Sequence, residues 1–242
     1  MPRPPRPLDP ARSQRLLVVA GEAFAADGFE GASLNDILSR AGMGKSSFYH
    51  RFADKAALHD WVTRTMANAI LTEIRVPALG TLSAASFRPE LTALLSRFQA
   101  LAAAQPELMN LGLMFHNSVD VSPQRAIAEV RSGVMKWISA ALERGRAVGV
   151  VRSDLPPDLL SEWAIASLTT IDRWALTAAE PMPTRASTST AAIDALWSLL
   201  APPQVVVAQV AQRPLPRPDL PSHPHITEPP ASSRNYGGGS AF

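Results

Sequence analysis

SLNDILSRAGMGKSSFYHRFADKAAL, from Ser33 to Leu58, carries the clearest structural pattern in this sequence. Apolar residues recur at helical spacing in its first part, and a second helical segment follows from about Gly44 to His50. Between them stands Ala41-Gly42-Met43, where Gly42 can supply the positive φ that a tight turn between helices often needs. The second segment would be roughly 10 Å long, comparable to the width of a DNA major groove. The pattern predicts a helix-turn-helix.

The second helical segment has two unlike faces when it is drawn on a helical wheel. One arc collects a cation, a hydroxyl, a phenol and an imidazole, which can donate hydrogen bonds to base edges and phosphates. The members of this polar arc are Lys45, Ser46, Tyr49 and His50. Phe48 and Phe52 lie on the opposite side. Their expected packing partners in the preceding helices are Phe24, Leu34 and Ile37.

Helix start and stop signals extend this pattern in both directions. Gly28 is expected to end a first helix. Ser33 and Asp36 have the spacing of a capping box for the next one. Asp54 can cap a long helix that runs to about Arg75.

Five further helical segments follow, and no convincing run has the period of a β-strand. They are expected at 89–104, 106–118, 123–148, 156–180 and 186–201. Four prolines stand at plausible first-turn positions: Pro89, Pro106, Pro123 and Pro156. The predicted fold class is all-α, with about nine helices, an N-terminal three-helix helix-turn-helix domain and a C-terminal helical domain.

Composition sets the outer limits. The 242 residues carry a formal net charge of only +2 with a sequence pI of about 9.4, so bulk charge argues neither for nor against a nucleic-acid partner. The absence of cysteine excludes disulfides, a thiolate zinc site and a cysteine nucleophile, and it fits a cytoplasmic protein. Neither a signal peptide nor a membrane span is predicted.

The two ends differ in composition from the middle. Of the 22 prolines, five lie in residues 2–10 and nine lie from Pro202 onward, and both regions are predicted to be disordered. The expected divisions are an N-terminal arm at 1–10, a DNA-binding domain at 11–58, a helical regulatory and dimerisation domain at 59–201, and a Pro-rich tail at 202–242.

From Arg15 through Leu58 the sequence resembles the signature of the TetR family of transcriptional regulators. The residues that carry the resemblance are Phe24, Gly28-Phe29, Ser33, Ile37, Ala41-Gly42, Phe48-Tyr49, Phe52 and Lys55. The resemblance implies a bacterial regulator, usually a repressor, that binds an inverted-repeat operator as a homodimer and is released by a small molecule bound in its C-terminal domain. Gly21 is smaller than the residue often seen at its position in this family, and looser packing of the first helix is expected there.

The resemblance implies particular functional residues only within this signature, from Arg15 to Leu58. The resemblance implies DNA contacts at Ser33, Lys45, Ser46, Ser47, Tyr49, His50 and Lys55. In the divergent C-terminal domain, an apolar effector pocket has seven candidate residues; the methionine, phenylalanine and tryptophans among them also suit ordinary core packing, and the histidine and arginine would supply polar contacts. They are Met114, Phe115, His116, Trp137, Trp163, Arg173 and Trp174. The apolar stripes of 156–180 and 186–201 are expected to form a four-helix interface with a second copy.

Other classes of function have less support. GMGKSS resembles the end of a phosphate-binding loop, but Ser39 stands where that motif needs glycine and a helix replaces the required strand. The histidines form no ligand cluster, and no catalytic constellation is visible, so no metal, no cofactor and no enzymatic activity is predicted. The main alternative is a helical small-molecule sensor or carrier that does not regulate DNA.

Overall fold

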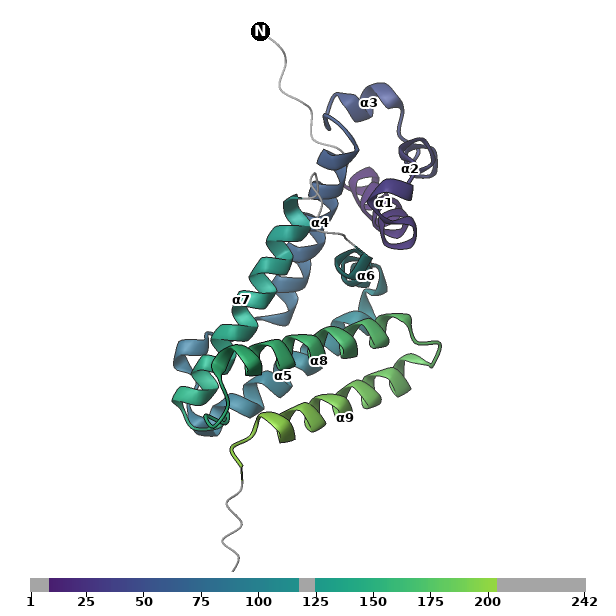
Figure 1. Ribbon diagram of the computed structural model, residues 1–242. Coiled ribbons are helices and arrows are strands. Elements are labelled where there is room, and N and C mark those ends of the chain that lie inside the picture. Colours follow the sequence, from purple (N-terminus) through teal and green to yellow (C-terminus); the bar gives the residue numbers. More distant parts are fainter. Residues whose placement is uncertain (1–8, 118–124, 204–242) are drawn as a thin grey trace, which may run out of the picture. The chain divides into compact units, whose positions relative to one another are not determined.

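The computed structural model describes residues 9–117 and 125–203 (Figure 1). The α-helices are α1 Pro10–Gly31, α2 Leu34–Ala41, α3 Lys45–Tyr49, α4 Lys55–Ile74, α5 Ala84–Ala104, α6 Asn110–Asn117, α7 Arg125–Ala147, α8 Pro157–Thr177 and α9 Met182–Leu200. Two short 3₁₀ helices, η1 Leu79–Thr81 and η2 Pro106–Met109, complete the elements. Across these described residues the chain has nine α-helices and no strand, which confirms the predicted all-α class.

Two predicted segments fall largely outside the described residues. These are the N-terminal arm, of which Asp9 and Pro10 are described, and the Pro-rich tail, of which Pro202 and Pro203 are described. Pro10 is the first residue of α1 and not part of an arm, in keeping with the preference of proline for a first helical position. Pro123 also lies outside the described residues.

The local signals around the helix-turn-helix are confirmed. Gly28 has a φ of 68° and breaks α1 before its last turn, and Gly42 ends α2 with a φ of 65°. Half of the predicted capping box forms, because the Asp36 N–H donates to Ser33 Oγ at 3.4 Å. Asp54 caps α4 by accepting the Ala57 N–H on Oδ1 at 2.8 Å.

Two predicted helix starts are wrong. α5 begins at Ala84, five residues before Pro89, which therefore lies inside the helix. Ser83 and Ser86 cap this start reciprocally: Ser83 Oγ accepts the Ser86 N–H at 3.2 Å, and Ser86 Oγ accepts the Ser83 N–H at 2.9 Å. α9 begins at Met182, four residues earlier than the apolar pattern indicated.

A first hydrophobic core joins the helix-turn-helix to the helices that follow it. Phe24, Ile37 and Phe48 are buried in it, as predicted. Val62 and Met66 of α4 are fully buried in the same cluster, which also receives side chains from η2, α6 and α7. The packing that holds the helix-turn-helix therefore continues past residue 58.

The expected looseness at Gly21 is wrong. A Cβ atom at Gly21 would lie 2.3 Å from Met66 Cε, and Met66 is completely buried. The absence of a side chain at Gly21 leaves the space that the end of the Met66 side chain fills, so the small residue is closely packed and not loose.

A second core lies among α5, α7, α8 and α9. Phe87 is 1% exposed at its centre, and its ring meets Trp197 edge to face at 5.9 Å. Leu160, Leu196 and Leu200 are buried here, so much of the apolar surface of α8 and α9 packs within the chain. These two helices run side by side (Figure 1). In the part of the chain that the structure describes, no helix is both long and apolar enough to cross a membrane.

Candidate nucleic-acid interface

α3 is a five-residue helix whose apolar side is anchored by aromatic rings. Phe48 is completely buried, and its ring centroid lies 5.4 Å from that of Phe52. Phe52 in turn lies 5.6 Å from Trp61 of α4. This aromatic row fixes which side of α3 faces inward.

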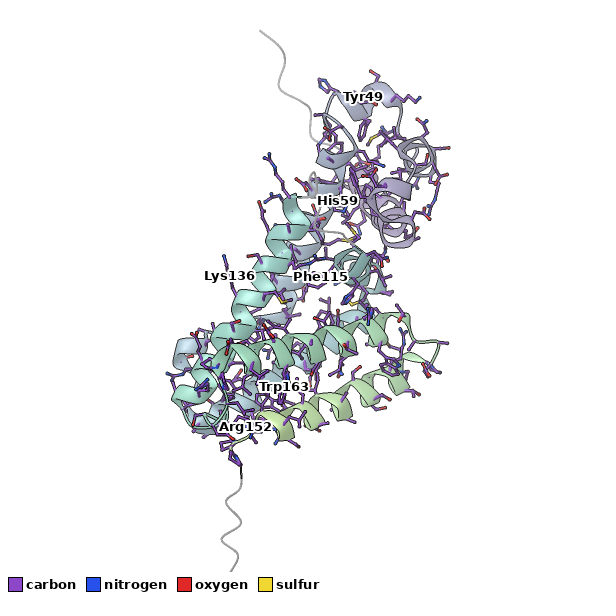
Figure 2. The ribbon with its side chains drawn as sticks, viewed as in Figure 1. Tyr49, His59, Phe115, Lys136, Arg152 and Trp163 are labelled. Carbon is purple, nitrogen blue, oxygen red and sulfur yellow. The ribbon has the colours of Figure 1, made fainter. Side chains whose placement is uncertain are left out.

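The polar side of α3 is turned to solvent. Five of the predicted DNA-contact residues are exposed there: Lys45, Ser46, Ser47, Tyr49 and His50. Tyr49 is 59% exposed (Figure 2). Its ring also packs edge to face against Phe48 at 5.0 Å, so one side of the phenol contacts the core and the other faces solvent. Hydroxyl, ammonium and imidazole groups thus share one accessible surface, which suits hydrogen bonding to phosphates and base edges.

Basic and acidic side chains are nearly balanced in the N-terminal segment that contains α3. Residues 9–60 contain six basic side chains, Arg12, Arg15, Arg40, Lys45, Arg51 and Lys55, and seven acidic ones, Asp9, Glu22, Asp27, Glu30, Asp36, Asp54 and Asp60. Arg40 is engaged by Glu22 at 2.6 Å and by Asp36 at 3.7 Å. Attraction to DNA must therefore come from individually placed donors rather than from a general excess of positive charge.

Ser33 and Lys55 occupy different surroundings. Ser33 is exposed at the start of α2, where its oxygen accepts a backbone N–H. Lys55 is half-buried and points toward the end of α1, where its Nζ donates to the carbonyls of Glu30 and Ala32, both at 3.2 Å. The ammonium lies 4.7 Å from the centre of the Phe29 ring.

His59 is a buried group that sequence reasoning did not single out. It is 2% exposed, and its ring stands edge-on to Phe24 at 4.8 Å and to Phe29 at 5.5 Å. Its Nδ1 has no hydrogen-bond partner among the described residues. Burial lowers the pKa of His59 below its ordinary value, and the neighbouring carboxylate of Asp60 acts in the opposite direction.

The seven candidate effector residues have very different exposures. Met114 is buried in the first core, and Trp137 packs against the second. Phe115, His116 and Trp174 are half-buried, whereas Trp163 and Arg173 are exposed. His116 Nε2 lies 2.8 Å from Asp172 Oδ2, which links α6 to α8. Among residues 9–117 and 125–203, no three potential metal-ligating side chains gather together.

Hydrogen bonds from α6 and α7 reach back to the N-terminal helices. Asn117, the last residue of α6, donates through Nδ2 to the Ala25 carbonyl of α1 at 2.9 Å. The Ala126 N–H at the start of α7 donates to Asp60 Oδ1 of α4 at 3.0 Å. Helices of the expected regulatory domain are thus bonded directly to those that carry α3.

Comparison with known proteins agrees with this geometry. Residues 16–60 match the family model described as bacterial regulatory proteins, tetR family. The HTH-type transcriptional repressor DhaR of Mycobacterium sp. (strain GP1) is 29% identical over 163 residues, which cover 64% of this chain and 77% of that protein.

Solved structures share the fold at low identity. A TetR family transcriptional regulator from Chloroflexus aurantiacus J-10-FL has a TM-score of 0.62 at 22% identity and covers 80% of this chain and 95% of its own. The ketosteroid transcriptional regulator KstR2 of Mycobacterium tuberculosis has a TM-score of 0.61 at 18% identity, with coverages of 82% and 99%. The transcriptional regulator FadR of Bacillus subtilis, solved with stearoyl-CoA, has a TM-score of 0.58 at 17% identity, with coverages of 77% and 98%.

The family match and the structural site coincide. The matched segment contains the whole helix-turn-helix, including the exposed side of α3 and the buried Phe48 and Phe52 beneath it. The structural matches cover 77–82% of the chain and so extend well past the family match, which ends at residue 60 in the first turns of α4. Residues 16–60 thus carry the DNA-binding segment of bacterial regulatory proteins of the tetR family, and the chain as a whole is similar to a TetR-type repressor in sequence and to TetR-family regulators in fold.

Proposed function

We propose that this regulator is a homodimeric repressor in which the two copies of α3 read the half-sites of an inverted-repeat operator. The observation that carries the proposal is the division of α3 into a fully buried Phe48 and an exposed polar side. A short helix held by its apolar side presents its donors to a duplex without rearrangement, as recognition helices do. A repressor of chromosomal genes would act in the bacterial cytoplasm.

The exposed side chains suggest separate tasks. Lys45 suits guanine O6 and N7 or a phosphate, and Ser46 can hydrogen-bond several base edges. Ser47, Tyr49 and His50 suit phosphate oxygens, as does Ser33 at the start of α2. Base contacts from Lys45 and Ser46 would set the sequence read, and the phosphate contacts would set the register of the protein on the DNA.

A dimer is required for useful specificity because one five-residue helix makes few base contacts. Two large apolar side chains remain exposed on the last two helices, Trp163 of α8 at 46% and Leu199 of α9 at 55%. We assign this surface to the contact with the second copy, where α8 and α9 of both chains would form a four-helix interface. The two copies of α3 would then meet half-sites about 34–36 Å apart or a multiple of it.

The effector is proposed to be an apolar small molecule bound among α6, α7 and α8. FadR of Bacillus subtilis, which shares this fold, was solved with stearoyl-CoA, a molecule with a long apolar acyl chain, and KstR2 is named a ketosteroid regulator; both names support a ligand with a large apolar part. The half-buried candidates Phe115, His116 and Trp174, together with Met114 and Trp137, suit such a site better than the exposed Trp163 and Arg173. The bond from Asn117 to α1 offers a route from this region to the DNA-binding helices.

Selection of bound sequences from random double-stranded DNA tests the DNA-binding function directly. We expect enrichment of an inverted repeat, protection of both half-sites by one dimer, and affinity that falls as salt rises. Recovery of no sequence above background, or an affinity that does not respond to salt, would support the alternative of a carrier without DNA regulation. Compounds that release the selected operator would then identify the effector.

A further inference from the structure

The end of α1 presents backbone carbonyl groups that need partners. The last four backbone carbonyls of an α-helix receive no hydrogen bond from an N–H group of the same helix. Here α1 is kinked at Gly28, and the carbonyls of Glu30 and Ala32 follow the kink. Lys55 Nζ donates to both at 3.2 Å, and its positive charge lies at the negative end of the helix dipole.

Aromatic contacts strengthen the same junction. The ammonium of Lys55 lies 4.7 Å from the centre of the Phe29 ring, within the range of a cation–π interaction. The other neighbour of Phe29 is His59, which stands one helical turn after Lys55 on α4 and meets that ring edge to face at 5.5 Å. Lys55 and His59, both in the first turns of α4, thus contact Phe29 near the end of α1.

The position of α3 depends on this junction. α3 is joined to α2 by residues 42–44 and to α4 by residues 50–54, so both ends are set by its neighbours. The α1 end leads directly into α2, and Lys55 connects that end to α4. Lys55 therefore joins the two elements between which α2 and α3 are held.

We propose that Lys55 is a positioning residue that locks α1 to α4 and so orients α3, instead of binding a DNA phosphate. The inference rests on the proposed DNA-binding function and names how its reading helix is held. Two of the three ammonium N–H groups are already used inside the protein. A phosphate contact would have to compete with two backbone acceptors and an aromatic ring.

Salt dependence separates the two roles. Each phosphate neutralised by a protein cation contributes about 0.9 to the slope of log affinity against log salt concentration. If Lys55 contacts a phosphate, its removal lowers this slope. If Lys55 positions α3, its removal weakens operator binding and lowers thermal stability while the slope stays at the wild-type value.

The test compares Lys55→Met, Lys55→Gln and Lys55→Arg in the full chain on the selected operator and on unrelated DNA. Lys55→Met keeps the aliphatic stem and removes every donor. We expect roughly tenfold weaker operator binding, a smaller loss on unrelated DNA, an unchanged salt slope and a melting temperature lower by about 5 °C. Lys55→Gln should show a smaller loss of affinity, and Lys55→Arg should restore affinity and stability, because it retains charged donors.

Affinities are measured at a temperature where circular dichroism shows each variant folded, so loss of folded protein cannot mimic loss of orientation. Lys45→Met is the matched control, an exposed lysine on α3 whose removal should weaken binding without lowering the melting temperature. A slope reduced by about 0.9 in Lys55→Met or Lys55→Gln, with the melting temperature unchanged, overturns the proposal. Unchanged affinity in Lys55→Met also overturns it. If the wild type itself binds no DNA, the proposed function fails, and the melting temperatures still report whether Lys55 locks the junction.

Discussion

Lys45 lies on the exposed side of α3, where the buried Phe48 fixes its outward direction. Replacement by alanine removes a cation and its donors without disturbing the core. We expect Lys45→Ala to weaken specific operator binding by about 1–3 kcal/mol and to relax the preference at one base pair if it reads guanine. Fluorescence anisotropy with the selected operator and with single-base variants measures both effects. Unchanged affinity for the operator would exclude Lys45 from the contact.

His59 predicts an acid-sensitive stability. Its pKa in the folded protein lies below the ordinary value of about 6.5, because burial disfavours the imidazolium. Below that ordinary value the unfolded chain therefore binds more protons than the folded one. The stability contributed by neutral His59 is complete above about pH 6.5 and is lost as the pH falls toward the folded-state pKa. The neighbouring Asp60 carboxylate opposes the shift, and burial outweighs it.

Urea unfolding between about pH 5 and 8 measures this loss, and His59→Phe should flatten the acid side of the curve. His50→Ala is the matched control, since His50 is exposed directly after α3 and its removal should leave the curve unchanged. An equal acid-side loss of stability in wild type and His59→Phe would show that another group is responsible.

The residues predicted correctly are those whose role depends on local periodicity. Phe48 and Phe52 stand four positions apart and share a face of any helix, so their burial was visible in the sequence. The inward direction of Lys55 was not visible, because its acceptors lie 25 and 23 residues earlier in the chain. Whether a lysine points to DNA or to a backbone carbonyl depends on tertiary distances that spacing does not contain.

At the level of elements, helix ends were predictable where one side chain or one glycine defines them. Asp54 caps the start of α4 and Gly42 ends α2 through hydrogen bonds to residues three or four positions away, and both of these helix ends are as predicted. The start of α5 was missed because Pro89 was taken as a first-turn residue. The true cap pairs Ser83 with Ser86, and serine in place of glutamate or glutamine concealed the capping box.

The turn between α2 and α3 gives an element-scale prediction. Gly42 has a φ of 65°, and a Cβ atom there would meet no atom closer than 3.9 Å, so the penalty for alanine is conformational and not steric. We expect Gly42→Ala to lower the free energy of unfolding by about 1–2 kcal/mol. Gly133→Ala is the matched control, because Gly133 lies within α7 with no atom within 4 Å of its added Cβ.

Replacing glycine by alanine should therefore change the free energy of unfolding in opposite directions at positions 42 and 133. Alanine at position 133 should stabilise the protein by up to about 1 kcal/mol, since glycine is unfavourable inside a helix. Urea unfolding of both variants measures the difference. Equal effects at positions 42 and 133 would mean that the left-handed turn does not constrain the helix-turn-helix.

Across the whole molecule, cationic side chains from distant segments bind the carbonyl ends of helices. Arg97 donates to the Ile74 carbonyl at the end of α4 at 2.6 Å. Arg185 donates to Ala175 near the end of α8 at 2.8 Å, and Arg152 donates to Leu199 near the end of α9 at 3.2 Å. Lys55 does the same at the end of α1. These long-range caps satisfy carbonyls that no local motif reaches, and sequence patterns cannot pair them.

The largest scale concerns the second copy of the chain. Trp163 is 46% exposed on α8, the surface that we assign to the dimer. Trp163→Glu would place a charge in that apolar contact, so we expect a shift to monomers and loss of operator binding, because a single α3 cannot span two half-sites. Sedimentation velocity and gel shift on the same samples measure both effects.

Val134→Glu is the matched control, since Val134 is 43% exposed on α7 and lies outside α8 and α9. It introduces the same charge at a similarly exposed apolar position and should leave the protein dimeric and active. A Trp163→Glu variant that stays dimeric would remove α8 from the interface. If only Val134→Glu dissociates the dimer, the interface lies on α7 and not on α8 and α9. The distance between the two copies of α3 would then be set by that α7 interface.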